Sequence, residues 1–440
     1  MISKIRNGFI NILEILHLRI FGHKMSYEMK KFIGHLPWSF LGLFFSSLIL
    51  FSVNILAGRI LGPESYGKYN LVLVVASIMA IPILLGLDIT SIKYISNAKN
   101  QLDKNKYLSN SFRIAVFSSF TVFVLVATFY LKISEIFGVS IEIVFVALIF
   151  SILLSFKNLL DSFIKSFHFF RFQAIVRIVE SSVVIFLFFY FFYFLKKNEY
   201  EFYLISSISG AAVLCGVYLF RIRKNIIGWD KEKVEEIFHY SKTTIILACI
   251  LMIMNSMDKI FIGKFLGVHL LGIYSAYFTV SMIFISQVVL MLGNVFFPMI
   301  SSAENKYAVV KKIDRLGIIF FIPGTLVIAT CAFLMLKLYG KEFQLNQWYI
   351  IWFSALSFLQ IPSDFYRNVI SSENRLYAKM KKAFFVIPII FFSLYYLVLS
   401  SNATRNFFNA ILIYSIYVLS YLFITRFICR DIISYNNLKQ

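Results

Sequence analysis

The stretch NILAGRILGPESYGKYN, from Asn54 to Asn70, separates two long apolar runs and contains an arginine, small or turn-forming residues and two tyrosines. A second stretch, KIFIGKFLGVHLLGIYS from Lys259 to Ser275, repeats the pattern. With a shift of 205 positions, both copies read G-[RK]-x-L-G-x4-G-x-Y, beginning at Gly58 and at Gly263. Glycine tolerates positive φ, so each copy predicts a compact turn between two helices.

The composition is that of a membrane protein. Of 440 residues, 59% are hydrophobic and only 15% are charged, whereas soluble domains carry about 25% charged residues. The net charge of +21 would suggest nucleic acid as a partner of a soluble protein. In a membrane protein, an excess of Lys and Arg in cytoplasmic loops explains it, and we expect no nucleic-acid partner.

Twelve stretches are apolar and long enough for a membrane helix, which needs about 20 residues. They span 37–58, 69–91, 111–131, 138–160, 174–195, 202–220, 242–263, 273–299, 314–337, 346–366, 382–400 and 407–427. The segments between them alternate in charge: one set holds 33 Lys and Arg, the other 9. This alternation predicts twelve spans with both termini in the cytoplasm.

The two glycine motifs occupy the same place in each half, between its first and second span. We therefore expect an all-α integral membrane protein with two six-helix bundles, related by a pseudo-twofold axis along the membrane normal. The expected parts are an N-terminal segment that is either an amphipathic surface helix or a tail, two bundles, a cytoplasmic linker and a tail. Their limits are 1–36, 37–220, 221–241, 242–428 and 429–440.

AGRILGPESYGKYNL and the following GLDITSIKYIS (Gly86–Ser96), with DKIFIGKFLGVHLLGIYSAY (Asp258–Tyr277) in the second half, resemble a known family. This is the polysaccharide-export branch of the MATE-like flippase superfamily, which includes the Wzx-type O-antigen flippases. The resemblance covers essentially the whole chain. It implies a transporter, not an enzyme, in the bacterial cytoplasmic (inner) membrane.

The resemblance also implies a substrate. Such flippases move undecaprenyl-diphosphate-linked oligosaccharide, the repeat unit of O-antigen or another surface polysaccharide, from the cytoplasmic to the periplasmic leaflet. Membrane lipids, a polysaccharide polymerase and a chain-length regulator are the expected partners. No cofactor is expected beyond a coupling H⁺ or Na⁺, and the gradient of the sugar unit is an alternative driving force.

Ionisable residues inside spans are costly and are functional candidates. The candidates for the diphosphate are cations: Arg59, Lys93, Lys259 and Lys264. Lys93 stands where the family often has arginine, so it keeps the charge but loses bidentate geometry. For Arg59 and Lys264, snorkelling toward lipid headgroups is the alternative interpretation.

Acids and amides supply the remaining candidates. Asp88 and Asp258 are candidates for ion or proton coupling, and Asp258 with Lys259 is alternatively a structural ion pair. Candidates for sugar contacts are Asn54, Asn255, Gln287 and Asn294; interhelical hydrogen bonding is the alternative role for these amides. No catalytic or metal-binding residue is predicted.

Three charged pairs at helical spacing are read as local ion pairs or entrance residues: Asp161 with Lys165, Arg177 with Glu180, and Asp364 with Arg367. A cation-coupled drug or small-molecule antiporter of the same superfamily is the first alternative function. A membrane glycosyltransferase or polysaccharide polymerase is the second, and the short outer loops disfavour it.

Overall fold

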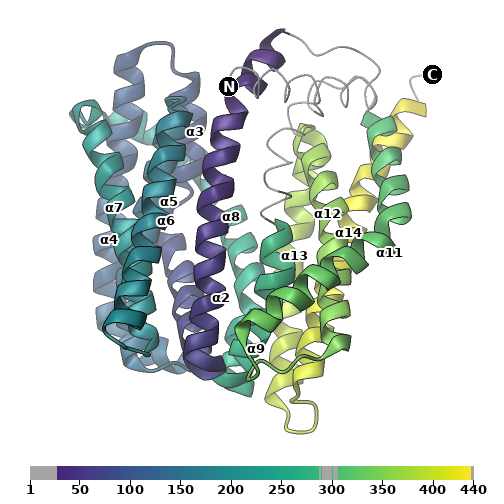
Figure 1. Ribbon diagram of the computed structural model, residues 1–440. Helices are drawn as coiled ribbons and strands as arrows, with labels where there is room; N and C mark the ends of the chain where they lie inside the picture. The colour runs from purple at the N-terminus through teal and green to yellow at the C-terminus, as the bar shows by residue number, and fades with distance from the viewer. Residues whose placement is uncertain (1–26, 287–288, 290–299, 301–305, 438–440) are drawn as a thin grey trace, which may run out of the picture. The chain divides into compact units, whose positions relative to one another are not determined.

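The structure, a computed structural model, describes residues 27–286, 289, 300 and 306–437, and every regular element in these residues is a helix. The expected N-terminal segment lies outside the described residues up to residue 26. The helices (Figure 1) are α2 (Tyr27–Leu84), α3 (Leu87–Asn97), α4 (Gln101–Phe137), α5 (Ile141–Ser166), α6 (Phe170–Phe189), η1 (Tyr190–Phe194), α7 (Tyr200–Ile222), η2 (Arg223–Asn225), α8 (Lys231–Leu266), α9 (Val268–Phe278), η3 (Thr279–Ile283), α11 (Lys306–Tyr339), α12 (Gln347–Ser371), α13 (Asn374–Ser400) and α14 (Phe407–Asn437).

Within the described part of the chain, nine helices are long and apolar enough to cross a membrane. The prediction of an all-helical, multi-pass membrane protein is therefore confirmed. The first of the nine, Gly42–Leu84, contains 43 residues and would be about 65 Å long if straight, twice the thickness of the hydrocarbon core. A break at Gly62 divides it, and α8 and α12 are long helices outside the nine.

The chain divides into two compact units. Residues 42–273 with 392–407 form the first, called the 42–273 unit below. Residues 274–391 and 408–437, with the start of α2, form the second, called the 274–437 unit. Helix α8 and the beginning of α9 therefore pack with the helices of the first half of the sequence.

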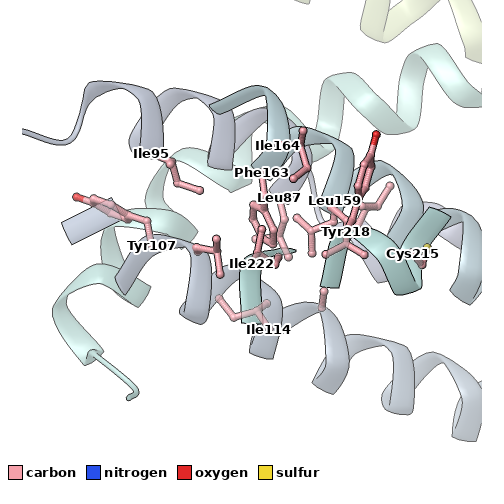
Figure 2. Packing of buried hydrophobic residues seen from close by; sticks show 14 of the residues in the cluster. Leu87, Ile95, Tyr107, Ile114, Leu159, Phe163, Ile164, Cys215, Tyr218 and Ile222 are labelled. Carbon is pink, nitrogen blue, oxygen red and sulfur yellow. The ribbon is translucent and has the colours of Figure 1, made fainter. Parts of the chain in front are cut away.

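The core of the 42–273 unit joins α3, α4, α5 and α7. Figure 2 shows Leu87, Ile114, Phe163 and Tyr218 among its side chains. Ile237 of α8, 1% exposed, belongs to the same cluster. Because van der Waals packing holds helices together in lipid, this cluster fixes the beginning of α8 on the first-half helices.

The segment between α7 and α8 is held on α4 by hydrogen bonds. Arg113 donates to the carbonyl of Ile227 at 2.7 Å. The Asn110 amide donates to the carbonyl of Asp230 at 2.8 Å and accepts from its N–H at 3.2 Å. The Asp230 carboxylate then caps α8 by accepting from the N–H of Lys233 at 3.2 Å. The linker expected at 221–241 thus overlaps the beginning of a continuous α8.

Candidate functional site

Each copy of the glycine motif contains one residue that breaks the helix. Gly62 has φ 69° and ψ 172°, and Gly267 has φ 90° and ψ 161°. This region of φ and ψ is essentially restricted to glycine. The two residues correspond under the shift of 205, so the prediction of positive φ in both copies is confirmed at these positions. A single non-helical residue takes the place of the longer turn that the sequence suggested.

The break in α2 turns the chain back on itself. Tyr66 donates its hydroxyl hydrogen to Oδ1 of Asn54 at 2.7 Å, although twelve residues of straight helix would separate them by about 18 Å. Pro63 follows the break, and proline is favoured in the first turn of a helix because its missing N–H needs no partner there. Gly62 and Pro63 together therefore end one helix and start the next.

The two motifs meet in the 42–273 unit through a pair of glycines. A Cβ placed on Gly67 would lie 1.9 Å from the carbonyl oxygen of Val268, and one on Gly272 would lie 1.8 Å from that of Pro63. Pro63 corresponds to Val268 and Gly67 to Gly272, so each contact is the counterpart of the other. No side chain fits at either glycine, and α2 and α9 therefore cross in direct backbone contact. We call this contact the glycine crossing.

Asn54 lies beside the glycine crossing in a polar network. Besides accepting from Tyr66, it donates to the hydroxyl of Tyr203 at 3.4 Å. The ring of Tyr69 lies 4.3 Å from that of Tyr203, and its hydroxyl is 3.3 Å from Oγ of Ser207. These bonds join α2 to α7. Asn54 therefore forms interhelical hydrogen bonds, the alternative role given above for the candidate amides.

The two corresponding motif cations have different surroundings. Lys264 donates to the carbonyls of Glu135 and Ile136 at 3.0 and 2.8 Å. These carbonyls end α4, where a cation is favoured by the helix dipole. Arg59 is exposed, and the described residues provide it with no ion-pair partner.

Lys259 and Asp258 form a buried ion pair. Nζ of Lys259 lies 3.0 Å from Oδ2 of Asp258 and also donates to the carbonyl of Asn255 at 3.2 Å. Lys259 is 8% and Asp258 2% exposed, whereas Asn255 is exposed. This geometry is compatible with the alternative interpretation of Asp258 and Lys259 as a structural ion pair.

The remaining predicted site residues lie elsewhere. Asp88 is half-buried in the first turn of α3, where the helix dipole favours a negative charge. Lys93 is exposed, with Nζ 3.5 Å from the centre of the Tyr240 ring. Gln287 and Asn294 lie outside the described residues. The candidates therefore do not gather in a single described cluster.

A buried charge network connects α5 and α6 in the same unit. The local pairs predicted from spacing are present, with Asp161 to Lys165 at 2.9 Å and Arg177 to Glu180 at 3.8 Å. Arg177 also contacts Asp161 at 3.2 Å, and Lys157 pairs with Glu180. Neither of these two longer-range contacts has a local signal in the sequence.

The second half contains ion pairs of its own in the 274–437 unit. Asp364 and Arg367, predicted from their spacing, are 3.1 Å apart. Arg426 of α14 lies 2.5 Å from Asp314 of α11, and Tyr366 donates to the same carboxylate. Charged groups thus connect the helices of each unit.

The segment before α8 carries a titratable contact outside the candidate spans. Lys106 lies 2.8 Å from the Asp230 carboxylate. The hydrogen bond from Lys106, together with that from the N–H of Lys233, holds the pKa of Asp230 below its ordinary value. The carboxylate is therefore negatively charged at neutral pH and attracts Lys106.

The fold is similar to that of solved transporters. The chain aligns with an inward-facing multidrug resistance MATE family transporter of the MOP superfamily at 12% identity, covering 88% of this chain and 96% of that one, with a TM-score of 0.64. It aligns with a MATE protein in complex with MaL6 at 13% identity, 92% and 97% coverage and a TM-score of 0.58. A MOP superfamily transporter from Pyrococcus furiosus gives 13% identity, 92% and 96% coverage and a TM-score of 0.55.

The sequence itself matches a family model. No curated protein matches the chain. The model described as polysaccharide biosynthesis protein, a family of Wzx-like flippases, matches residues 36–304, which is more than half of the chain. The chain therefore belongs to the polysaccharide biosynthesis protein family, and it is a multi-pass membrane protein with the fold of MATE transporters.

Proposed function

We propose that the protein is a flippase for undecaprenyl-diphosphate-linked oligosaccharide, moving a surface-polysaccharide repeat unit from the cytoplasmic to the periplasmic leaflet. Family membership supports the substrate class. The observation that carries the mechanism is the glycine crossing, in which the two motifs make matching contacts at corresponding residues. Such contacts are expected of two repeats related by a twofold axis, the architecture of alternating-access transporters.

We propose twelve spans in this arrangement. Gly62 divides the Gly42–Leu84 stretch into two of them, and α8 and α12 supply the two others that composition alone does not select. We propose that the protein lies in the bacterial cytoplasmic membrane with both termini in the cytoplasm. The gathering of Lys and Arg in one set of segments supports this orientation. The glycine crossing then lies near the periplasmic side.

In this mechanism the glycine crossing closes the periplasmic side while the substrate enters from the cytoplasm. Contacts of Cα–H with carbonyl oxygens are weak individually, so a backbone crossing can separate without leaving a charge unpaired. Gly62 and Gly267 provide the breaks at which helices change direction. Arg59 at the proposed periplasmic mouth attracts the diphosphate, and Lys264 becomes available if α4 moves away.

The alternative functions are less well supported. A glycosyltransferase or polymerase needs a large outer loop for its catalytic groups, whereas the connections on the proposed outer side are short: 138–140, 195–199, 340–346 and 401–406. A cation antiporter needs a free acid. Asp258 is paired with Lys259, which leaves Asp88 as the candidate for a coupling H⁺ or Na⁺.

The decisive experiment is a leaflet-accessibility assay. The protein is reconstituted in vesicles with a fluorescent undecaprenyl-diphosphate oligosaccharide, as wild type and as Arg59→Gln with Lys264→Gln. We expect wild type to move the lipid and the double variant, folded, to move it at least tenfold more slowly. Movement at the wild-type rate would remove both cations from the mechanism but keep the function. If wild type moves no lipid-linked sugar and exchanges a small cation for protons, the antiporter is the correct function.

A further inference from the structure

An open groove runs between α13 and α14 within the 274–437 unit. Its volume is about 670 Å³. The walls are apolar and consist of Ala383, Phe423, Ile424, Phe427 and Ile428. A groove of this size is large enough to hold part of an apolar chain.

Two aromatic side chains of the groove wall are largely exposed. Phe423 and Phe427 are each 68% exposed and lie four residues apart, on the same face of α14. The lining residues of α14 run from Phe423 to Asp431, about 12 Å of helix. The groove thus extends along the helix for more than two turns and presents side chains suited to an extended hydrocarbon.

One end of the groove is charged. Lys379 and Asp431 form an ion pair there. Lys382 and Arg430 do not line the groove but are next in sequence to the lining residues Ala383 and Asp431, and both are exposed. These four residues carry a surplus of two positive charges. A diphosphate diester carries two negative charges and matches this surplus, whereas the phosphodiester of a typical anionic phospholipid carries one.

We propose that the groove binds the isoprenoid chain of a polyprenyl-diphosphate-linked glycan, with its diphosphate at the end formed by Lys379, Lys382 and Arg430. This inference rests on the proposed function and identifies where the lipid part of the substrate is held. The cationic end lies at the cytoplasmic side in the proposed orientation. The chain then stays in lipid along the groove while the sugar enters the protein, so only the polar part needs a polar route.

Photolabelling tests this site in the full-length protein in nanodiscs. The probe is a polyprenyl-diphosphate disaccharide with a photoactivatable group on the isoprenoid chain, and a phosphatidylglycerol with the same group is the comparison lipid. We expect the polyprenyl probe to label the α14 peptide 423–431 at least fivefold more strongly than the comparison lipid does. Equal labelling by the two probes would overturn the proposal, because the groove would then hold any membrane lipid.

Variants separate the groove from the lipid surface around it. Ala383→Phe fills the groove, and Val386→Phe places the same ring at a position on α13 that is 51% exposed and does not line the groove. We expect at least fivefold weaker labelling and a raised KM in transport for Ala383→Phe, and values within twofold of wild type for Val386→Phe. Phe427→Ala removes a wall without adding bulk and should also weaken labelling.

The outcomes distinguish this inference from the proposed function. Wild-type labelling and KM in both Ala383→Phe and Phe427→Ala would overturn the groove as a binding site, even if the protein transports the lipid. Absence of transport of any polyprenyl-diphosphate glycan by wild type would instead contradict the proposed function, and preferential labelling of 423–431 by the polyprenyl probe would still support the groove.

Discussion

The two glycine motifs, 54–70 and 259–275, called the first and the second hinge below, have similar backbones but different side chains. Both break at a glycine with positive φ, and both present a second glycine at the crossing. At corresponding positions, however, Asn54 has Lys259 as its counterpart and Tyr66 has Leu271. The first hinge is supported by neutral hydrogen bonds and the second by a buried ion pair.

This difference shows which features the repeat requires. A crossing without side chains needs glycine in both copies, since either Cβ would clash with a backbone carbonyl. The polar groups beside the crossing can differ between the two copies, because a buried polar group of either kind is stable once its hydrogen bonds are satisfied. The shared backbone therefore belongs to the proposed movement, and the unequal side chains provide the means to test each hinge separately.

The largest expected effect is at the ion pair of the second hinge. Lys259→Met breaks the buried ion pair with Asp258, and breaking such a pair by removing one charge typically costs about 3–5 kcal/mol. Asn54→Ala, at the corresponding position of the first hinge, removes neutral hydrogen bonds worth about 1 kcal/mol each. Thermal unfolding in detergent measures both. The double variant Asp258→Asn with Lys259→Met should recover most of the loss, and an equal loss for Lys259→Met and Asn54→Ala would contradict the difference between the hinges.

The next effect is at the glycine crossing. Gly67→Ala and Gly272→Ala each place a methyl group in a backbone carbonyl, and such overpacking costs about 1–3 kcal/mol. We also expect at least tenfold slower transport in the assay described above. Because the two glycines share one contact, the double variant should cost less than the two single losses together.

Gly216 of α7 provides the matched control for the crossing. A Cβ at Gly216 has no heavy atom within 4 Å, so Gly216→Ala should keep transport and change stability by less than about 1 kcal/mol. If Gly67→Ala changes transport and stability as little as Gly216→Ala does, transport does not depend on the backbone contact between α2 and α9.

A smaller effect is expected at the Tyr66 hydroxyl, which donates a hydrogen bond within the first hinge. Tyr66→Phe removes the hydrogen bond to Asn54 and should cost about 0.5–1.5 kcal/mol. The second hinge has Leu271 here and lacks this bond, so the variant makes the two hinges more alike. Tyr193→Phe, at a side chain that is 57% exposed, should leave the unfolding temperature unchanged. If Tyr66→Phe lowers stability no more than Tyr193→Phe does, the hydrogen bond from Tyr66 to Asn54 does not stabilise the first hinge.

Features of the fold with a local signal were predictable from the sequence. Apolar length predicted membrane helices, the repeat predicted glycines with positive φ, and spacing predicted the pairs of Asp161 with Lys165 and of Asp364 with Arg367. These features depend on neighbours within four residues or on residue type alone. That is why single-sequence reasoning could identify them.

Features that depend on tertiary contacts were not predictable. Lys264 caps a helix 128 residues away, and Lys157 pairs with Glu180 on a different helix. The sequence suggested a turn at Gly62, but the helix resumes at once because Pro63 is compatible with a first helical turn. The candidate cations were chosen by type, whereas their surroundings depend on which helix ends lie nearby.

The smallest expected effect concerns the segment before α8, which hydrogen bonds hold on α4. The pKa of Asp230 is lowered in the folded protein by Lys106 and by the N–H of Lys233, so its stabilising contribution is present above the unfolded pKa of about 3.9. That contribution is lost as the pH falls through the lower folded pKa. The difference in unfolding temperature between wild type and Asp230→Asn should therefore be constant above about pH 5 and shrink below about pH 4. Glu232→Gln, at an exposed neighbouring residue, is the control. The difference between wild type and Asp230→Asn could instead persist unchanged down to pH 3. In that case the neutral hydrogen bonds of Asn110, and not the charge on Asp230, hold this segment to α4.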